Sequence, residues 1–140
     1  MIKQRFVFLE HMADIKFKAF GISLAETFEN AAVAFSKYVS ANEKLKSNKK
    51  KTIKLKAADN EALLYSFLDE LIYLVDAENF IVTSAKVKIE KNNLKASLLG
   101  ANTKNLKLNH VKAATYAEMY IRKIKFGSEE AWEAQAVLDV

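Results

Sequence analysis

Hydrophobic and polar residues alternate along several short stretches of this chain, and the alternation predicts β-strands. Residues 6–10 form a short apolar run, and residues 14–21 place Ile15, Phe17 and Ala19 on one face with lysines on the other. Further strands are predicted at residues 52–57, 80–91, 93–101, 115–127 and 130–140. Asn92 and Asn93 are expected to form the tight turn between two of these strands.

Two longer stretches carry apolar residues at helical spacing. Residues 23–39 begin with Ser23 and place Glu26 three positions later, which is the capping box of a helix start. Residues 59–78 begin with Asp59 or Asn60 as the N-cap. The order of elements predicts an α+β fold, in which a mixed, mostly antiparallel β-sheet or sandwich is packed by two α-helices. Residues 1–140 are expected to form a single domain.

Composition removes several classes of protein. The chain has no cysteine, which excludes disulfides and thiolate metal sites, and its two histidines make a multi-histidine zinc site improbable. No apolar run reaches the length of about 18 residues that a membrane span needs. The chain starts with methionine and shows no signal peptide. We therefore expect a soluble cytoplasmic protein with no membrane contact.

The chemistry of the chain is concentrated at its two ends. Glu10, His11 and Asp14 interrupt the first strand-rich stretch, and Asp139 precedes the terminal Val140. If the first and last strands are neighbours, Asp14, Asp139 and the terminal carboxylate of Val140 converge in a set of hard oxygen ligands suited to Mg²⁺, Ca²⁺ or Mn²⁺. The alternative is that Asp14 caps a turn, Asp139 is a solvated strand end, and His11 is hydrogen-bonded to backbone.

Templates of self-contained catalysis are missing from the sequence. It contains no glycine-rich phosphate loop, no cysteine nucleophile and no G-x-S-x-G elbow. No spacing singles out a Ser–His–Asp triad among the many serines and two histidines. We therefore expect a protein that is not an enzyme.

Lysines give the chain a formal net charge of +5 and gather in particular segments. They cluster between positions 44 and 51, alternate between positions 86 and 95, and accompany Arg122 near the end of the chain. Such a surface permits contact with RNA or with an acidic partner. Alternating lysines are also typical of the solvated face of a one-sided sheet, and few aromatic residues accompany them.

Four segments together resemble the archease family. EHMADIKFKAFGISLAETFENAAVAF resembles its opening acid-His-Thr-Ala-Asp motif, strand and first helix, and ALLYSFLDELIYLVDAENF resembles its second helix. VKAATYAEMYI is similar to its Lys-Ala-x-Thr-Tyr segment, and AVLDV to its hydrophobic-Asp-hydrophobic ending. The resemblance covers almost the whole chain in the family's order. Met12 stands in place of a threonine, Ala117 in place of a histidine, and LLGAN lacks the acid that commonly follows Gly100.

The resemblance implies a function that composition does not. Archeases are protein cofactors of RtcB-type RNA ligases in tRNA splicing and RNA repair; they promote ligase guanylylation and repeated turnover. The family is reported to bind a divalent metal through aspartates, which carries over to Asp14 and Asp139, with the carboxylate of Val140 as a third ligand. Glu10 and His11 would then orient this corner, and Lys112, Thr115 and Tyr116 are candidate ligase contacts.

Two other functions remain open from the sequence. One is a metal-dependent phosphoesterase that uses the same aspartates, although a general base is not evident. The other is a basic RNA-binding or chaperone-like module that uses the lysines. RNA is otherwise expected to be engaged only indirectly, through the ligase. The sequence does not determine the oligomeric state.

Overall fold

The computed structural model describes residues 4–10, 13–41 and 43–140 and contains two sheets and two helices. The strands and helices follow the order predicted from the sequence. Their bounds are β1 Phe6–Leu9, β2 Asp14–Gly21, α1 Leu24–Ser40, β3 Lys49–Lys56, α2 Asn60–Glu78, β4 Phe80–Glu90, β5 Asn93–Asn102, β6 Ala113–Phe126 and β7 Glu129–Asp139.

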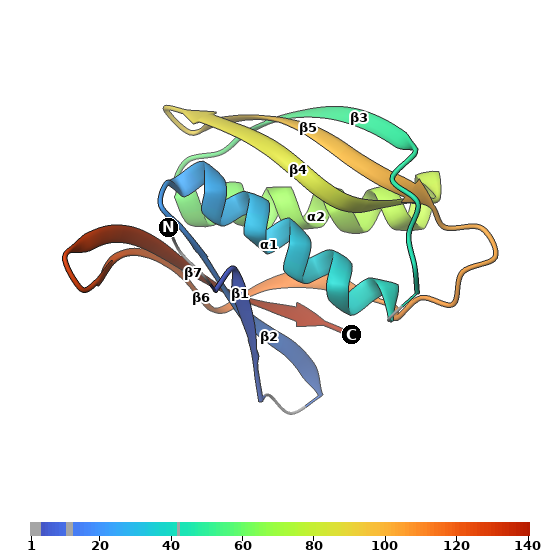
Figure 1. The fold of residues 1–140 in the computed structure, drawn as a ribbon, viewed down its shortest axis with the longest axis horizontal. Coiled ribbons are helices and arrows are strands. Elements are labelled where there is room, and N and C mark those ends of the chain that lie inside the picture. The colour runs from blue at the N-terminus through green and yellow to red at the C-terminus, as the bar shows by residue number, and fades with distance from the viewer. Residues whose placement is uncertain (1–3, 11–12, 42) are drawn as a thin grey trace.

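The strands divide into two separate sheets. Sheet A has the order β1-β2-β7-β6, and sheet B has the order β3-β5-β4. Each of the described strand pairings is antiparallel. Figure 1 shows that α1 and α2 lie between the two sheets, so that each helix has a sheet on both sides. The expected α+β fold with two packing helices is confirmed, and the helices form its middle layer.

This middle position explains the burial of α1. The sequence pattern predicted an amphipathic helix, yet Thr27, Asn30 and Ser36 are buried as well as the apolar positions. Three alanines, Ala31, Ala32 and Ala34, are fully covered, and their small side chains let backbone approach from both sides. The rings of Phe28 in α1 and Phe67 in α2 lie 5.7 Å apart at the centre of the core.

Helix starts were predicted correctly, whereas some strand ends differ. The Glu26 amide donates to Ser23 Oγ (3.1 Å) and the Ala62 amide to Asp59 Oδ1 (2.7 Å), as the capping patterns predicted. Strand β3 starts at Lys49, three residues before the start of the strand predicted at residues 52–57. The β4–β5 turn has Lys91 and Asn92, both at positive φ, as its central residues, one position before the predicted pair.

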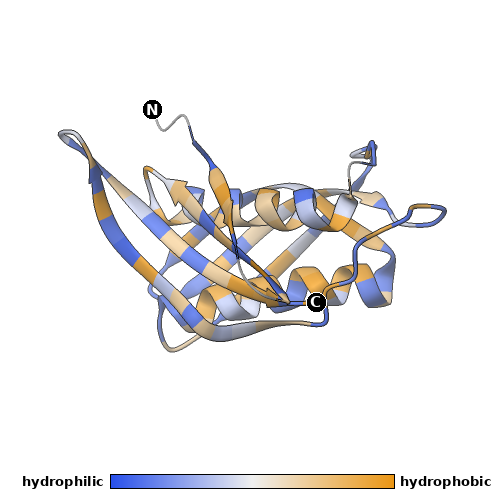
Figure 2. Ribbon diagram, turned by 90° about the horizontal axis from the view of Figure 1, so that it is seen from below, coloured by the Kyte–Doolittle hydropathy of each residue, from blue (hydrophilic) through white to orange (hydrophobic). Residues whose placement is uncertain are grey.

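Figure 2 views the molecule from the side of sheet A, and polar and apolar colours alternate along its strands. One set of side chains, including Phe17, Ala19, Ala134, Ala136 and Leu138, is buried in the core toward the helices. The other set points to the outer face of the sheet. Both strands that carry the candidate acidic residues belong to this sheet, at its centre.

Candidate functional site

The candidate site is the corner of sheet A where β2 begins and β7 ends. Asp14 and Asp139 are direct register partners in the β2–β7 pairing. Because side chains of directly opposed residues project to the same face, both carboxylates lie on the outer face of the sheet, with Cβ atoms about 5 Å apart in such pairs. Asp14 is half-buried and Asp139 is exposed. The predicted juxtaposition of the two chain ends is therefore present.

The third strand of this corner fixes the end of β7. Ala113 of β6 is the partner of Asp139 on the other side, and the Lys112 amide donates to the Asp139 carbonyl oxygen at 2.8 Å. Asp139 is thus held between two strands although it is the penultimate residue. The side chain of Val140 is half-buried and packs against the core, which fixes the position of the chain terminus.

The chain enters this corner through a constrained backbone. Ala13, immediately before Asp14, has a φ of 66°. The left-handed conformation costs a residue with a β-carbon roughly 1–2 kcal/mol, and such positions cluster at functional sites. Glu10 is exposed. His11, which we expected to orient the corner, and Met12 lie outside the described residues.

The donor set fits a metal ion that retains open coordination positions. Within residues 4–10, 13–41 and 43–140, no group of three or more His, Cys, Asp or Glu side chains could hold a metal. Two aspartates with a chain-terminal carboxylate would leave several positions for water or a partner's oxygens. Mg²⁺ is commonly bound in this way, through one or two carboxylates plus substrate phosphates. The metal itself and its ligands, Asp14, Asp139 and Val140, stay a prediction.

Another acidic residue, Glu118, lies beside this corner and was not predicted from the sequence. Lys16, two positions from Asp14 on the same face, donates to Glu118 Oε1 at 3.0 Å. Glu118 belongs to a bulge in β6, because four residues between Thr115 and Tyr120 face the single residue Ala136 on β7. Its φ of 58° also marks the irregularity. Alternating sequence in this stretch gave no signal for a bulge.

The bulge also explains where the predicted ligase-contact residues lie. The Thr115 hydroxyl accepts from the Ala117 amide at 3.0 Å, inside the bulge. Tyr116 is 55% exposed, and its ring stacks on that of Tyr65 in α2, with centroids 4.3 Å apart. Tyr116 therefore presents one ring face to α2 and leaves much of its surface accessible.

Further along the same face, a buried carboxylate anchors β6 to β7. Glu133 is only 6% exposed, and its Oε2 accepts from the Tyr120 hydroxyl at 2.7 Å and from Arg122 Nη2 at 2.7 Å. The Arg122 guanidinium also lies over the Tyr120 ring. Burial, then the hydrogen bond to Glu133, raises the pKa of Tyr120 to about 12. This cluster is structural in character, since the buried carboxylate of Glu133 is bonded by two side chains of the neighbouring strand, Tyr120 and Arg122.

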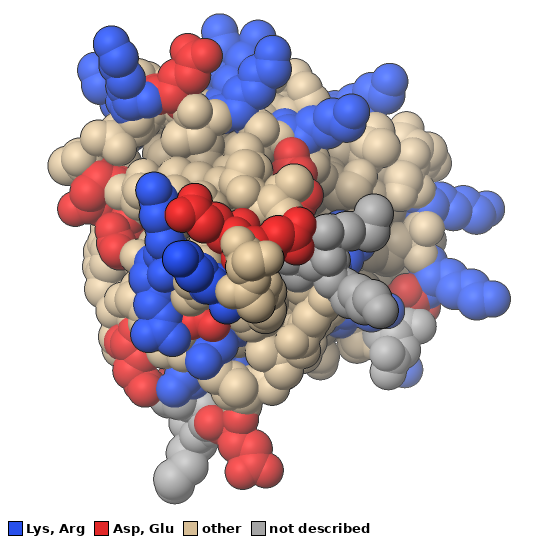
Figure 3. All heavy atoms as spheres, turned by 60° about the vertical axis from the view of Figure 1, so that its left-hand side comes forward, with Lys and Arg blue, Asp and Glu red and all other residues tan. Residues whose placement is uncertain are grey.

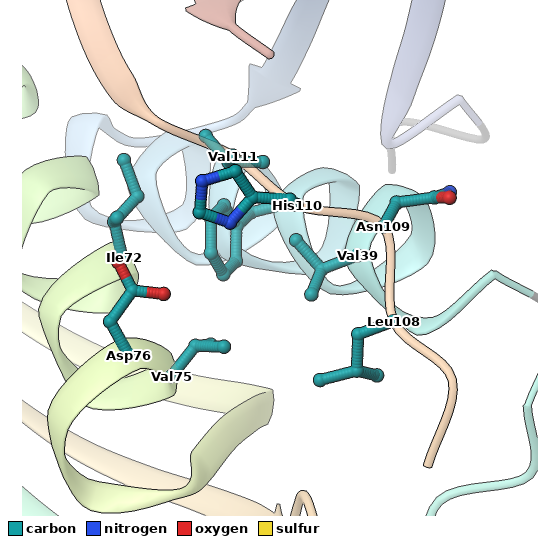
Figure 4. A pocket seen from close by; sticks show the side chains of 9 residues that line it. Val39, Ile72, Val75, Asp76, Leu108, Asn109, His110 and Val111 are labelled. Carbon is teal, nitrogen blue, oxygen red and sulfur yellow. The ribbon is translucent and has the colours of Figure 1, made fainter.

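A cavity between α1, α2 and the loop before β6 is a weaker candidate. Its volume is about 100 Å³, and Figure 4 shows His110 and Asp76 at its edge among aliphatic side chains such as Val39 and Leu108. Ligand sites usually measure roughly 300–1,000 Å³. The cavity is too small for a substrate, and we do not assign a function to it.

Comparison with known proteins agrees with this architecture. The fold is that of the solution structure of Methanobacterium thermoautotrophicum protein 1598, with a TM-score of 0.75 and 26% identity, over 97% of this chain and 99% of that chain. The family model described as the Archease protein family (MTH1598/TM1083) matches residues 6–140. This chain belongs to the archease family.

Relatives called "Protein archease" match over nearly their whole length. The protein of Pyrococcus abyssi is 35% identical over 98% of this chain and 99% of its own, and that of Methanosarcina barkeri is 33% identical over 98% and 97%. The protein of Pyrococcus furiosus is 36% identical over 94% and 95%. In the part of the chain that the structure describes, no helix is long and apolar enough to cross a membrane.

Proposed function

We propose that this protein is a non-enzymatic cofactor of an RtcB-type RNA ligase, acting in tRNA splicing and RNA repair by promoting guanylylation and repeated turnover of the ligase. Membership of the archease family supports this function. The observation that carries it to particular residues is the pairing of Asp14 with Asp139 across β2 and β7. The two ends of the sequence become one acidic corner.

In this proposal the corner binds a divalent metal ion, Mg²⁺, Mn²⁺ or Ca²⁺, through Asp14, Asp139 and the Val140 carboxylate. When bound, such an ion supplies charge that can orient and neutralise phosphate oxygens of a nucleotide. The protein itself determines the positions of the two aspartates. The Ala13 backbone and the Lys112–Asp139 hydrogen bond hold the aspartates at the ends of the two central strands of sheet A, where a ligase can approach them.

The test is a guanylylation assay with the RtcB-type ligase of the same organism. Ligase, GTP and divalent metal are incubated with and without this protein, and the fraction of guanylylated ligase and the number of RNA ends joined per ligase are measured. The wild-type protein is expected to raise both quantities. Asp14→Asn and Asp139→Asn, which keep the side-chain shape, are expected to abolish the increase.

The matched control is Asp69→Asn, an exposed aspartate on α2 that is not part of the corner. It is expected to behave like the wild type. If Asp14→Asn stimulates the ligase as strongly as the wild type does, the acidic corner has no part in the function. If the wild-type protein does not stimulate the ligase, the proposed role as a ligase cofactor is wrong. Turnover of RNA or nucleotide by the protein alone, lost in Asp14→Asn, would favour the phosphoesterase instead.

Metal binding is measured separately, on the protein without the ligase. Mn²⁺ titration followed by electron paramagnetic resonance should report one site that both aspartate variants weaken. Adding two glycines after Val140 keeps both aspartates but moves the terminal carboxylate away. Weaker Mn²⁺ binding in that variant would support Val140 as a ligand, and unchanged binding would exclude it.

A further inference from the structure

The outer face of sheet B carries six lysines on a surface about three strands wide. They occupy positions that point away from the helices on all three strands, and most of the intervening residues are small or amide side chains. The lysines of this face, which we call the lysine face, are Lys50, Lys54 and Lys56 of β3, Lys95 of β5, and Lys86 and Lys88 of β4. All six are exposed.

The centre of the lysine face is a row of like charges. Lys95 has Lys54 as its register partner on one side and Lys88 on the other. Like charges directly opposite one another on adjacent strands destabilise a sheet. The register thus places three ammonium groups where the fold alone would favour neutral or opposite charges.

In the part of the chain that the structure describes, few acidic side chains lie near these lysines. The outward positions of the three strands include one carboxylate, Glu90, beside the turn at the end of the sheet. Among the described residues, the ion pairs are Lys16–Glu118, Lys51–Glu78 and Arg122–Glu133, and none uses a lysine of this face. In Figure 3, Lys and Arg side chains crowd the upper part of the molecule, where Figure 1 places sheet B.

The chemistry of the face selects among possible anionic partners. Protein interfaces are depleted in lysine and enriched in aromatic residues and arginine. Here the large apolar side chain exposed among the lysines is Leu99, at 38%. Since no exposed aromatic ring lies on the strands of sheet B, bases have no stacking partner here, and the contacts left to the lysines are those with phosphates. Two depressions, of about 280 and 390 Å³ and both edged by lysines, offer space for phosphate groups.

We propose that the lysine face binds the phosphate backbone of RNA without sequence preference. The charge pattern is equally suited to RNA and to an anionic lipid surface. The choice of RNA rests on the proposed role in RNA ligation. The face belongs to sheet B, and the acidic corner belongs to sheet A on the other side of the helices (Figure 1). The protein would therefore contact RNA with one sheet and keep the other free for the ligase.

The test is RNA binding by the protein alone, measured by fluorescence anisotropy with an unstructured single-stranded RNA over a series of KCl concentrations. The central row is neutralised in the variant Lys54→Gln/Lys88→Gln/Lys95→Gln. Affinity for a polyanion falls with salt with a slope of about −0.7 for each phosphate neutralised on a single strand. The variant is expected to bind about tenfold more weakly or worse at low salt, with a slope shallower by about 2.

The matched control removes the same charge elsewhere. Lys44→Gln/Lys46→Gln/Lys104→Gln changes three exposed lysines in the connectors outside the strands. It is expected to keep most of the affinity and the steep salt dependence. Equal losses in the two triple variants would mean that net charge alone drives binding and would overturn the proposal, as would the absence of RNA binding by the wild type at low salt.

A parallel measurement separates RNA from lipid. Cosedimentation with vesicles containing phosphatidylserine is expected to show weaker binding than RNA at the same salt. Binding to vesicles without binding to RNA would overturn the choice of RNA. Because the ligase is absent from both measurements, their outcome is independent of whether the ligase is stimulated.

Discussion

The outer faces of the two sheets differ in how their charged side chains are paired. On sheet A, charges of both signs meet: Lys16 contacts Glu118, and Arg122 contacts the buried Glu133. On sheet B, Lys95 lies between two further lysines. The outward positions of sheet A hold both carboxylates and basic side chains, whereas those of sheet B hold six lysines and one carboxylate, Glu90. Away from the Asp14–Asp139 corner, the charged residues of sheet A hold its strands together, whereas the lysines of sheet B stay available to a partner.

The largest expected effect is at the buried carboxylate of sheet A. Glu133→Gln removes the charge that Arg122 and Tyr120 share while it keeps the volume of the side chain. Charge-assisted hydrogen bonds contribute about 2 kcal/mol, and the exposed Arg122 regains water, so we expect a loss of about 2 kcal/mol in the free energy of unfolding. Urea denaturation would measure it.

The control for this variant is Glu130→Gln, which lies three residues away in β7 and is exposed. It is expected to change stability by less than about 0.5 kcal/mol. A Glu133 variant as stable as this control would contradict the structural role of the cluster.

A smaller effect is expected from pH at the same cluster. The pKa of Tyr120 is raised to about 12 in the folded protein, above the value of about 10 in an unfolded chain. The neutral phenol therefore stabilises the fold fully below pH 10, and this contribution is lost as pH rises from about 10 through 12. Thermal unfolding should show a steeper loss of stability in that window for the wild type than for Tyr120→Phe.

In Tyr120→Phe the hydroxyl that titrates is absent, while the ring still lies beside Arg122. Parallel curves for the two proteins between pH 9 and 12 would show that this tyrosine is not linked to folding. The comparison cancels the titration of every other group that the two proteins share.

The smallest effect, and the one of opposite sign, is expected on sheet B. Lys95→Glu converts the central row into two pairs of opposite charge, and cross-strand pairs contribute roughly 0.2–1 kcal/mol each. We expect a gain in the free energy of unfolding of about 0.5 kcal/mol that shrinks with added salt. Lys16→Glu on sheet A, the same change beside Glu118, should instead destabilise. Loss of stability in both variants would contradict the contrast between the faces.

The sequence predicted the helices and strands far better than it predicted which strands pair with one another. Helix starts follow from local capping by Ser23 and Asp59, and strands follow from alternation. Pairing depends on contacts between distant segments, which no spacing encodes. The sequence therefore left open whether the strands form one sheet or a sandwich, and it did not predict the Lys54–Lys95–Lys88 row. The pairing of Asp14 with Asp139 was expected only on condition that the end strands are neighbours.

Local irregularities in the strands were the other feature that the sequence did not predict. The β6 bulge makes Glu118 a partner of Lys16, although the surrounding residues alternate as an ordinary strand does. Lys49–Lys51 lie outside the strand predicted at residues 52–57, yet pairing with β5 makes them part of β3. In both places tertiary pairing overrides local preference.

The order β1-β2-β7-β6 has a consequence for how the protein is made. Because β7 lies between β2 and β6 but follows every other strand along the chain, the centre of sheet A is filled by the strand that is synthesised after the rest. The nascent chain must hold β2 without this partner until β7 has been made, and such late, distant pairings are slow to form. The acidic corner therefore forms only after both Asp14 and Asp139 have been synthesised and β2 has paired with β7.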